Sequence, residues 1–311
     1  MRPVTVLYTG GTIGMRPGPD GLGPDAAFEG AFRAAVTGRD FHWLETPHLL
    51  DSSAMGPQDW QMIADLSRDI SGGLVILHGT DTMAYTAAAL SFLLHDLGAP
   101  VVLTGAQVPM QSEGSDAIAN AELALDVAAR SPRAEVMIAF GGALLRGNRA
   151  VKCHAQNPEA FCSPNFPALN GAEPVQFAHP FTGRQISPVG VLKLYPGIGA
   201  EALGGFAHLP GLVVEAFGSG NMPGEGTWFH AALMLARRRG QEIVVITQTG
   251  GGQVAARTYA AGASVAQLGL IPGGDLTTPA AVTKLGWLLA QGLRGDDLAD
   301  AMARPIGGEM S

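Results

Sequence analysis

The chain has 311 residues, of which 27 are acidic and 19 basic, so its formal net charge is −8. This negative balance makes nucleic acid and anionic membranes poor candidates for partners, and a hydrophobic content of 47% excludes intrinsic disorder. The 43 glycines follow no three-residue period, which excludes a collagen-like chain, and the length favours two domains that each bury a core.

The start of the chain and its cysteines predict the compartment. The first residues run directly into a strand-like segment, without the charged and apolar regions of a secretory signal. There is no uninterrupted stretch of about 18 apolar residues. Cys153 and Cys162 are too few for a disulfide framework, and with His154 they match no common zinc spacing. We expect a cytoplasmic protein whose cysteines are reduced.

Short β-branched runs, each followed by a polar turn and a helical pattern, recur in the first part of the chain. Four apolar strands are expected at Val4–Tyr8, Leu74–His78, Val101–Leu103 and Val136–Phe140. Such runs are typical of parallel strands covered on both faces. Asp81–Leu97 and Ser115–Ala129 are predicted as crossover helices, with Asp81 and Ser115 as N-caps. This alternation predicts an open, mainly parallel α/β sheet.

The second part of the chain repeats the alternation on a smaller scale. Residues 155–188 are rich in Pro, Asn, Phe and Gly and are expected to form connecting structure. Beyond them, strands are predicted at Val189–Leu194, Leu212–Phe217 and Ile243–Thr247, and helices at Phe229–Arg239, Tyr259–Gln267, Pro279–Gln291 and Asp296–Ala303. We predict a larger N-terminal catalytic α/β domain over residues 1–186, ending in the connecting segment, and a smaller C-terminal α/β domain over residues 187–311.

Hydroxyl side chains follow the first two predicted strands. They are Thr9, Thr12, Thr80 and Thr82, with Asp81 beside them. Ligands of an open α/β sheet bind at the carboxyl ends of its strands. Gly10, Gly11 and Gly79 would let backbone N–H groups approach such a ligand closely. Ordinary strand-to-helix turns are the alternative, because Thr, Asp and Gly are common in turns.

Phosphate-binding signatures are absent, whereas the lysines are informative. The chain has no Gly-Lys pair for a Walker loop, and the glycines from Gly218 onward do not complete a dinucleotide fingerprint. Only three lysines occur, one of them Lys152. Lysine, unlike arginine, can lose its proton and act as a base. A Thr80–Lys152–Asp81 relay of hydroxyl, amine and carboxylate is therefore one hypothesis, with chance placement of the lysine as the alternative.

Several longer motifs together resemble those of the bacterial-type L-asparaginases. They are TGGTIGM (9–15), DSSAM (51–55), HGTDTM (78–83), LTGAQVPM (103–110), SDAIANAELAL (115–125), RGNRAVK (146–152), FCSPN (161–165), LYPGI (194–198), GSGNMP (218–223) and GGDLTTPAAVTKL (273–285). The resemblance runs in order over essentially the whole chain and is strongest for the cytoplasmic, type I branch.

The resemblance implies a reaction, namely hydrolysis of the side-chain amide of L-asparagine to L-aspartate and ammonia through an acyl-enzyme intermediate. It implies Thr12 as the nucleophile. Thr80, Asp81 and Lys152 match the group that activates the threonine or the hydrolytic water. Neither a metal nor an organic cofactor is implied.

The resemblance also implies a set of binding residues. They are Ser52 for the substrate α-carboxylate, Ser53 beside it, Asp81 for the α-ammonium, and Gly11 and Ala106 along the site. Asn221 matches an asparagine that relatives lend to the site of a neighbouring subunit, which implies a homodimer or a dimer of dimers. A turn-capping asparagine is the alternative for that position.

One position departs from the family pattern. Residues 15–24 form a Gly/Pro-rich segment that is expected to act as a mobile lid. The family usually places a catalytic tyrosine in this lid, and the aligned residue here is Leu22. Tyr8, the nearest tyrosine in the sequence, is expected to pack in the core. We therefore expect reduced asparaginase activity or a shifted substrate.

Three other functions are considered. The first is hydrolysis of another small amide, such as glutamine. The second is the amidotransferase subunit that feeds ammonia to misacylated tRNA. That subunit has an additional N-terminal domain, whereas the motif here begins at Thr9, which disfavours it. The third is a weakly active or non-catalytic amino-acid-binding homologue, which only Leu22 supports.

Overall fold

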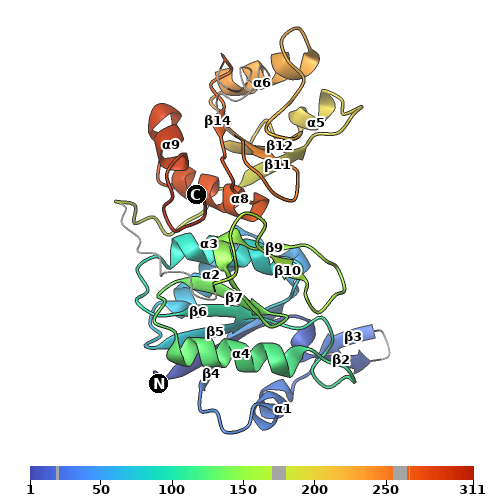
Figure 1. Cartoon of the computed structure of the whole chain (residues 1–311), viewed down its shortest axis with the longest axis vertical. Helices are drawn as coiled ribbons and strands as arrows, with labels where there is room; N and C mark the ends of the chain where they lie inside the picture. The colour runs from blue at the N-terminus through green and yellow to red at the C-terminus, as the bar shows by residue number, and fades with distance from the viewer. Residues whose placement is uncertain (19–20, 170–179, 255–264, 266) are drawn as a thin grey trace. The chain divides into compact units, whose positions relative to one another are not determined.

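Figure 1 shows the computed structural model of the chain, which describes residues 1–18, 21–169, 180–254, 265 and 267–311. The chain divides into two compact units, Met1–Gln176 and Phe177–Ser311. Each unit is built on a sheet of its own. The domain boundary predicted between residues 186 and 187 lies inside the second unit.

The N-terminal unit contains a six-stranded sheet in the order β4-β1-β5-β6-β7-β8. Its strands are β1 (Val4–Gly10), β4 (His42–Leu50), β5 (Gly73–Leu77), β6 (Val101–Thr104), β7 (Val136–Phe140) and β8 (Ala143–Arg146). Neighbouring strands are parallel except for β7 and β8, which are antiparallel. Every residue of β1, β5, β6 and β7 is buried, so the predicted apolar parallel strands are confirmed.

Helices cover both faces of this sheet. In Figure 1, α4 (Ala117–Arg130) lies on one face, and α2 (Pro57–Ser67) and α3 (Met83–Leu93) lie on the other. The short helix α1 (Phe28–Ala35) packs Phe28 against the ring of Tyr8, with 4.7 Å between centroids. Tyr8 also contacts Trp43 of β4, which confirms its predicted place in the core.

The two predicted crossover helices are present, but their predicted N-caps are wrong. Both helices begin two residues later than predicted, and their N-cap residues are Thr82 and Asp116, neither of which caps with its side chain. Ser115 accepts a hydrogen bond from the Ala117 N–H at 3.1 Å but precedes the N-cap. The Asp81 carboxylate instead accepts a hydrogen bond from Lys152, and the Asp116 carboxylate accepts from the N–H groups of Gln107 and Val108. The carboxylates at both helix starts therefore hold neighbouring segments rather than cap the helices.

The sequence analysis did not predict several other elements of this unit. They are β4, β8, α1, α2, the hairpin of β2 (Met15–Gly18) and β3 (Gly21–Pro24), the pair of β9 (Val151–Lys152) and β10 (Phe161–Cys162), and the 3₁₀ turns η1 (Thr12–Gly14), η2 (Ser52–Ala54) and η3 (Gly147–Arg149). β4 is an edge strand with mostly exposed or half-buried side chains. It therefore lacks the apolar run by which the inner strands are recognised.

The C-terminal unit contains a parallel sheet in the order β11-β12-β13-β14, with strands Val189–Lys193, Gly211–Ala216, Glu242–Thr247 and Ile271–Pro272. Its helices include α5 (Glu201–Gly204), α6 (Trp228–Arg238), α8 (Thr278–Ala290) and α9 (Gly295–Met302). The predicted strands and three of the predicted helices are therefore confirmed. The helix predicted over 259–267 lies almost entirely outside the described residues.

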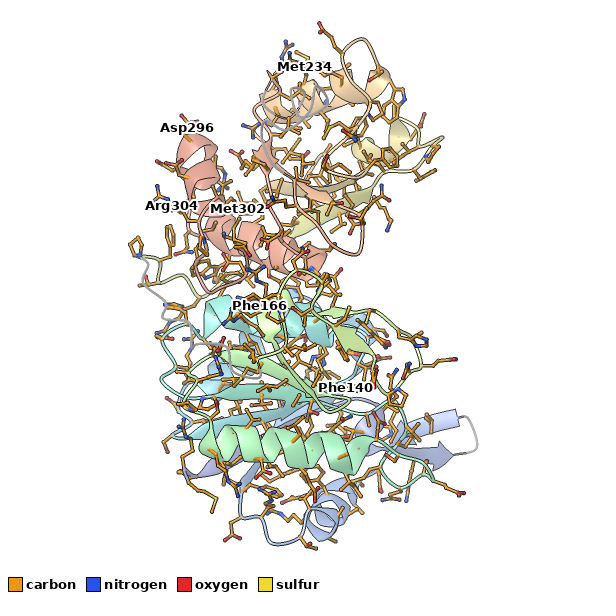
Figure 2. The ribbon with its side chains drawn as sticks, in the orientation of Figure 1. Phe140, Phe166, Met234, Asp296, Met302 and Arg304 are labelled. Atoms are coloured by element: carbon orange, nitrogen blue, oxygen red, sulfur yellow. The ribbon has the colours of Figure 1, made fainter. Side chains whose placement is uncertain are left out.

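Each unit closes a core of its own (Figure 2). In the N-terminal unit, the ring of Phe140 packs edge-on against Phe161, with 5.0 Å between centroids. In the C-terminal unit, α9 buries Met302 and exposes Asp296. None of the described helices combines the length and the apolar composition that crossing a membrane requires.

Two of the three lysines have structural partners in the C-terminal unit. Lys284 of α8 is fully buried and pairs with the equally buried Glu309 at 2.7 Å. Burial lowers the pKa of the Lys284 ammonium, and the attraction of Glu309 opposes that shift. Lys193 is exposed and lies 3.6 Å from Glu215. Lys152 alone among the three belongs to the N-terminal unit.

Candidate active site

Three loops expected to form the site meet at glycine residues. Gly11 has φ +90°, and a Cβ there would lie 2.4 Å from the backbone nitrogen of Gly79. A Cβ on Gly79 would lie 2.4 Å from Ser52 Oγ. The loops after β1 and β5 are thus packed backbone to backbone, and the Ser52 side chain of the loop after β4 lies against Gly79, at distances that only glycine permits. The structure therefore brings Gly11, Thr12, Ser52 and Thr80 to one edge of the sheet.

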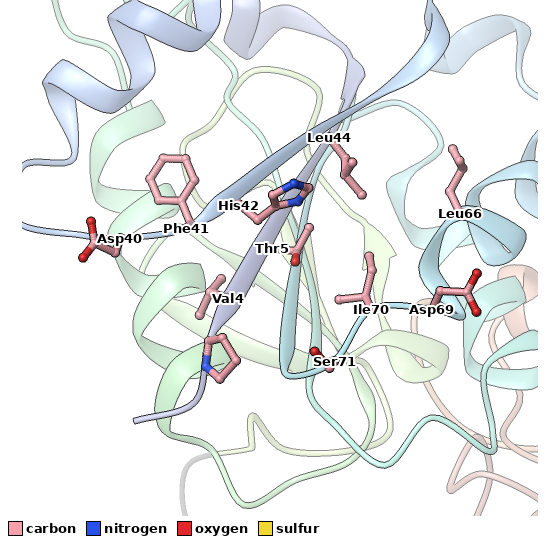
Figure 3. A pocket seen from close by; sticks show the side chains of 11 residues that line it. Val4, Thr5, Asp40, Phe41, His42, Leu44, Leu66, Asp69, Ile70 and Ser71 are labelled. Atoms are coloured by element: carbon pink, nitrogen blue, oxygen red, sulfur yellow. The ribbon is translucent and has the colours of Figure 1, made fainter.

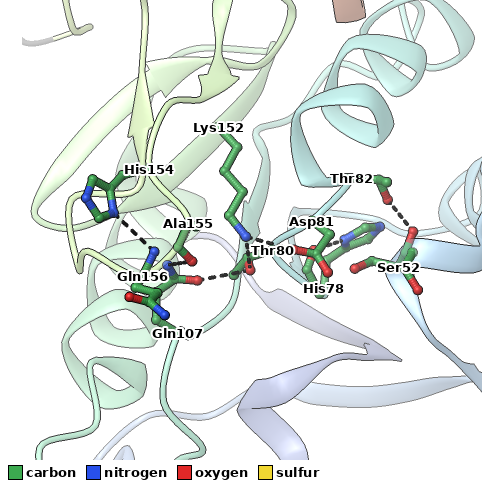
Figure 4. Close-up of polar contacts among 12 residues, drawn as sticks. Ser52, His78, Thr80, Asp81, Thr82, Gln107, Lys152, His154, Ala155 and Gln156 are labelled. Atoms are coloured by element: carbon green, nitrogen blue, oxygen red, sulfur yellow. Dashed lines mark hydrogen bonds and ion pairs between the residues drawn. The ribbon is translucent and has the colours of Figure 1, made fainter.

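Ser52 is the buried member of the serine pair. It lies in η2 after β4, and its carbonyl accepts a hydrogen bond from Thr82 Oγ1 at 2.7 Å (Figure 4). Asp51 accepts a hydrogen bond from the Ser53 backbone N–H at 2.9 Å, which fixes the turn. Ser53 itself is exposed. The pair thus presents one enclosed and one open hydroxyl.

The predicted contact of Thr80, Asp81 and Lys152 is present. Lys152 Nζ donates to Thr80 Oγ1 at 2.9 Å and to Asp81 Oδ1 at 2.8 Å (Figure 4). Lys152 comes from β9, and the other two residues follow β5. The Lys152 side chain is 18% exposed and that of Asp81 64% exposed, so the carboxylate keeps an open face beside the lysine. This arrangement is a hydroxyl, an amine and a carboxylate in direct contact.

Gln107 joins this group and was not among the predicted site residues. Its Oε1 accepts the hydrogen bond that Thr80 Oγ1 donates, at 3.0 Å. Gln107 follows β6, whose carboxyl end adjoins that of β5 in the sheet. That position in the loop LTGAQVPM was the available signal, because polar residues after neighbouring parallel strands meet at one edge. Ala106, the residue before it, is fully buried.

Thr12 lies in η1, directly after Gly11, and its side chain is half-buried. Its hydroxyl has no hydrogen-bond partner within the part of the chain that the structure describes. A backbone N–H, that of Met15, does bond to the Thr12 carbonyl. The loop is therefore ordered by its main chain while the Thr12 hydroxyl is left available.

His78, just after the end of β5, hydrogen-bonds to the backbone of the loop that carries Thr80. It is fully buried, and its Nδ1 lies 2.7 Å from the carbonyl oxygen of Gly79, so Nδ1 carries the hydrogen. Burial lowers the pKa of His78 to about 4, and the bond to Gly79 opposes the shift only in part. His78 Nε2 has no hydrogen-bond partner among the described residues. The ring is therefore a neutral donor at neutral pH.

The segment expected to act as a lid forms the β2–β3 hairpin. Leu22 lies opposite Pro17 in its register and is 53% exposed. The hairpin is tied at its base by Asp25, which accepts a hydrogen bond from Gln111 at 3.0 Å.

Tyr8, the tyrosine nearest to this hairpin in the sequence, is buried. Burial raises its pKa to about 12, with smaller contributions from the negative charges of Glu45 and Asp25. The buried phenol therefore remains protonated.

Asn221 lies in the C-terminal unit, in the turn after β12. Its backbone forms an antiparallel bridge with Phe217, with N···O distances of 2.7 and 2.9 Å. Its side chain is exposed. The geometry agrees with both expected roles of Asn221: its backbone closes the turn, and its exposed side chain could contact another subunit.

A cavity of about 600 Å³ lies away from these residues (Figure 3). It is lined at the start of β1 and β4 by Val4, Thr5, His42 and Leu44, and by Asp69 and Ile70 before β5. None of the predicted site residues lines it.

Among the described residues, no group of three or more His, Cys, Asp or Glu side chains is arranged to hold a metal ion.

The sequence matches two family models in tandem. Residues 3–180 match the model described as Asparaginase, N-terminal, and residues 188–302 match the Glutaminase/Asparaginase C-terminal domain. This chain belongs to the asparaginase family.

Individual relatives extend the match over the full length. L-asparaginase 1 of Escherichia coli (strain K12) is 39% identical, over 100% of this chain and 98% of the relative. The 60 kDa lysophospholipase of Mus musculus is 36% identical, over 100% of this chain and 63% of the relative. The crystal structure of L-asparaginase I from Vibrio cholerae has a TM-score of 0.86 and 36% identity, over 100% of this chain and 99% of that one. The comparisons therefore show the asparaginase-type α/β fold, and they support an amidohydrolase of the asparaginase/glutaminase family.

Proposed function

We propose that this protein hydrolyses L-asparagine to L-aspartate and ammonia, with Thr12 as the nucleophile. The observation that carries the proposal is the direct contact of Lys152 with Thr80 and Asp81, beside the loop that bears Thr12. A hydroxyl becomes a useful nucleophile only with a proton acceptor nearby, and lysine is the base that this chain offers.

The reaction divides into two balanced steps. In the first, Thr12 Oγ attacks the amide carbon, the carbon–nitrogen bond breaks, and the threonine proton leaves with the nitrogen as ammonia. In the second, water attacks the acyl ester, its proton returns to Thr12 Oγ, and aspartate is released. Lys152, as the neutral amine, accepts and returns the proton in each step, while Thr80 orients the attacking group beside it. Backbone N–H groups around Gly11 and Ala106 would stabilise the developing oxyanion.

We assign substrate recognition to one negatively charged carboxylate and two neutral hydroxyls. The open face of the Asp81 carboxylate suits the α-ammonium of asparagine. The hydroxyls of Ser52 and Ser53 suit the α-carboxylate, since they donate without adding charge. This division favours a zwitterionic amino acid over a simple amide. No metal or organic cofactor is part of the proposal.

We also infer a homo-oligomer, a dimer or a dimer of dimers, in which Asn221 completes the site of a neighbouring subunit. The exposed side chain of Asn221 supports this inference. A cytoplasmic location stays a prediction, as does the absence of nucleic-acid and membrane partners.

Glutamine is the second candidate substrate. The family model matched by residues 188–302 names glutaminase beside asparaginase. Glutamine has one more methylene group than asparagine, which changes only the distance between its amino-acid group and the amide that Thr12 attacks. A weakly active or amino-acid-binding homologue remains the alternative that Leu22 supports.

Ammonia release from asparagine and from glutamine tests the proposal directly. We expect wild-type protein to release ammonia faster from asparagine, and Thr12→Ala to lower kcat by about 10³-fold or more, because the nucleophile is lost. Thr12→Ser is the matched variant, since it keeps the hydroxyl and should keep measurable turnover. Wild-type protein without ammonia release contradicts the proposed activity, and undiminished turnover by Thr12→Ala contradicts the assigned nucleophile.

A further inference from the structure

The Thr80 hydroxyl lies in a hydrogen-bond chain that extends beyond the expected site. Thr80 Oγ1 accepts from Lys152 Nζ at 2.9 Å and donates to Gln107 Oε1 at 3.0 Å (Figure 4). A hydroxyl has one hydrogen and two lone pairs. Because the hydrogen is directed to Gln107, one lone pair faces Lys152 and the second is left for an incoming group.

The orientation of the Gln107 amide is decided by its other contacts. Gln107 Nε2 donates to the carbonyl of Ala155 at 2.9 Å and to that of Asn157 at 3.3 Å. The reversed amide would set its oxygen against both of these carbonyl oxygens. The amide oxygen of Gln107 must therefore face Thr80, where it can only accept.

The turn that supplies those two carbonyls is closed by His154. Its Nδ1 accepts a hydrogen bond from the backbone N–H of Gln156 at 3.1 Å (Figure 4) and another from that of Asn157 at 2.8 Å. This turn follows directly on β9, the strand that carries Lys152. One segment of chain thus places the lysine and orients the amide that shares Thr80 with it.

The backbone of Gln107 is held as firmly as its side chain. Its N–H donates to both carboxylate oxygens of Asp116, at 3.0 and 3.1 Å, and the N–H of Val108 donates to the same carboxylate at 3.1 Å. The buried Asn120 donates to Asp116 at 3.0 Å and to the Gly105 carbonyl at 3.1 Å. Gln107 is consequently preorganised and does not adapt its position to Thr80.

We propose that Gln107 is a positioning residue that sets the direction of the Thr80 hydroxyl hydrogen. Thr80 then offers its lone pairs both to Lys152 and to the hydrogen of the attacking group, Thr12 or water. This inference rests on the proposed amide hydrolysis, in which Thr80 orients that group by accepting its hydrogen bond and Lys152 takes its proton. Without Gln107 the hydroxyl rotates, and its hydrogen occupies the direction in which the attacking group must donate.

Gln107→Met tests this role in turnover, because it keeps the side-chain length and removes both hydrogen-bonding groups. We expect kcat for asparagine to fall about tenfold, the effect of one lost oriented hydrogen bond, while KM stays within about twofold. Gln107→Glu keeps an acceptor but loses the donors to Ala155 and Asn157, so its kcat should fall as well. Gln61→Met is the matched control, since the only hydrogen bond of the Gln61 side chain to a described residue runs to Asp65, one turn along α2, and it should keep wild-type kcat.

A second measurement needs no turnover. With Lys152, Lys193 and Lys284 as its only lysines, protein labelled with ¹³C at lysine Cε gives three NMR signals, and Lys152→Arg identifies the one to follow. In Gln107→Met we expect that signal to move and the other two to stay. A stationary Lys152 signal, or wild-type kcat in Gln107→Met, overturns the positioning role. Wild-type protein that releases no ammonia overturns the proposed function alone, because the NMR comparison still stands.

Discussion

Gly79 is the residue on which the packing of the three site loops depends most directly. Its backbone lies against Gly11 on one side and against the Ser52 side chain on the other. The space for a side chain at this point is already filled by Ser52 Oγ. A single methyl group is therefore enough to disturb the residue assigned to the substrate carboxylate.

Gly79→Ala should raise KM for asparagine by about tenfold or more, because the new Cβ displaces Ser52. Overpacking of this kind also costs about 1–3 kcal/mol of stability. Steady-state kinetics and thermal unfolding measure the two effects. Gly98→Ala is the control, because no atom lies within 4 Å of a Cβ built there. An unchanged KM in Gly79→Ala would show that Ser52 does not bind the substrate.

At the level of elements, the β2–β3 hairpin is the one most open to change. It is a two-stranded sheet of its own, and an isolated hairpin is marginally stable in water. Its anchor is Asp25, which contacts Arg16 at 3.7 Å as well as Gln111. Such an element, anchored at one end beside Thr12, suits a lid that closes over a substrate.

Leu22→Tyr should raise kcat for asparagine several-fold, since it restores a phenol where the family usually has one. The fold should tolerate the change, because Leu22 is 53% exposed. Leu22→Phe adds the ring without the hydroxyl and should leave kcat near the wild-type value. Rates of ammonia release by wild type, Leu22→Tyr and Leu22→Phe test this prediction. Equal turnover by Leu22→Tyr and wild type would show that the missing phenol does not limit kcat.

At the level of the whole molecule, His78 couples stability to pH. Its pKa is about 4 in the folded protein, because burial opposes its charge, and about 6.5 in an unfolded chain. Between these values the unfolded state binds more protons, so stability falls as the pH falls. The full stability is present above about pH 6.5, and a loss of about 3 kcal/mol is complete near pH 4.

Urea unfolding at pH 7.5 and pH 4.5, followed by circular dichroism, measures this loss. His78→Gln removes the titrating ring, so the difference between the two pH values should shrink by most of that amount, even where the variant is less stable overall. A pH dependence of the same size in both proteins would show that other groups cause it.

Burial separates the elements that could be predicted from those that could not. β5 is buried throughout and α3 almost throughout, so their mainly apolar patterns stand out in the sequence. β4 and the β9–β10 pair are short or exposed at the sheet edges, and their residues fit loops equally well. The predicted N-caps, Asp81 and Ser115, each lie one residue before the N-caps of α3 and α4, and their side chains bond to Lys152 and to the Val108 carbonyl.

The amino-acid sequence by itself determined the α/β class, the inner strands, the asparaginase family and the candidates Thr12, Thr80, Asp81 and Lys152. These follow from local hydrophobic periods and from motifs read along the chain. Only the tertiary structure decided that Lys152 reaches Thr80, that Ser52 fills the space beside Gly79, and that Gln107 belongs to the same group. The reason is physical: each of these contacts joins segments far apart in sequence. The parallel sheet brings the ends of β4, β5 and β6 together, and Lys152 reaches them from β9, outside that sheet.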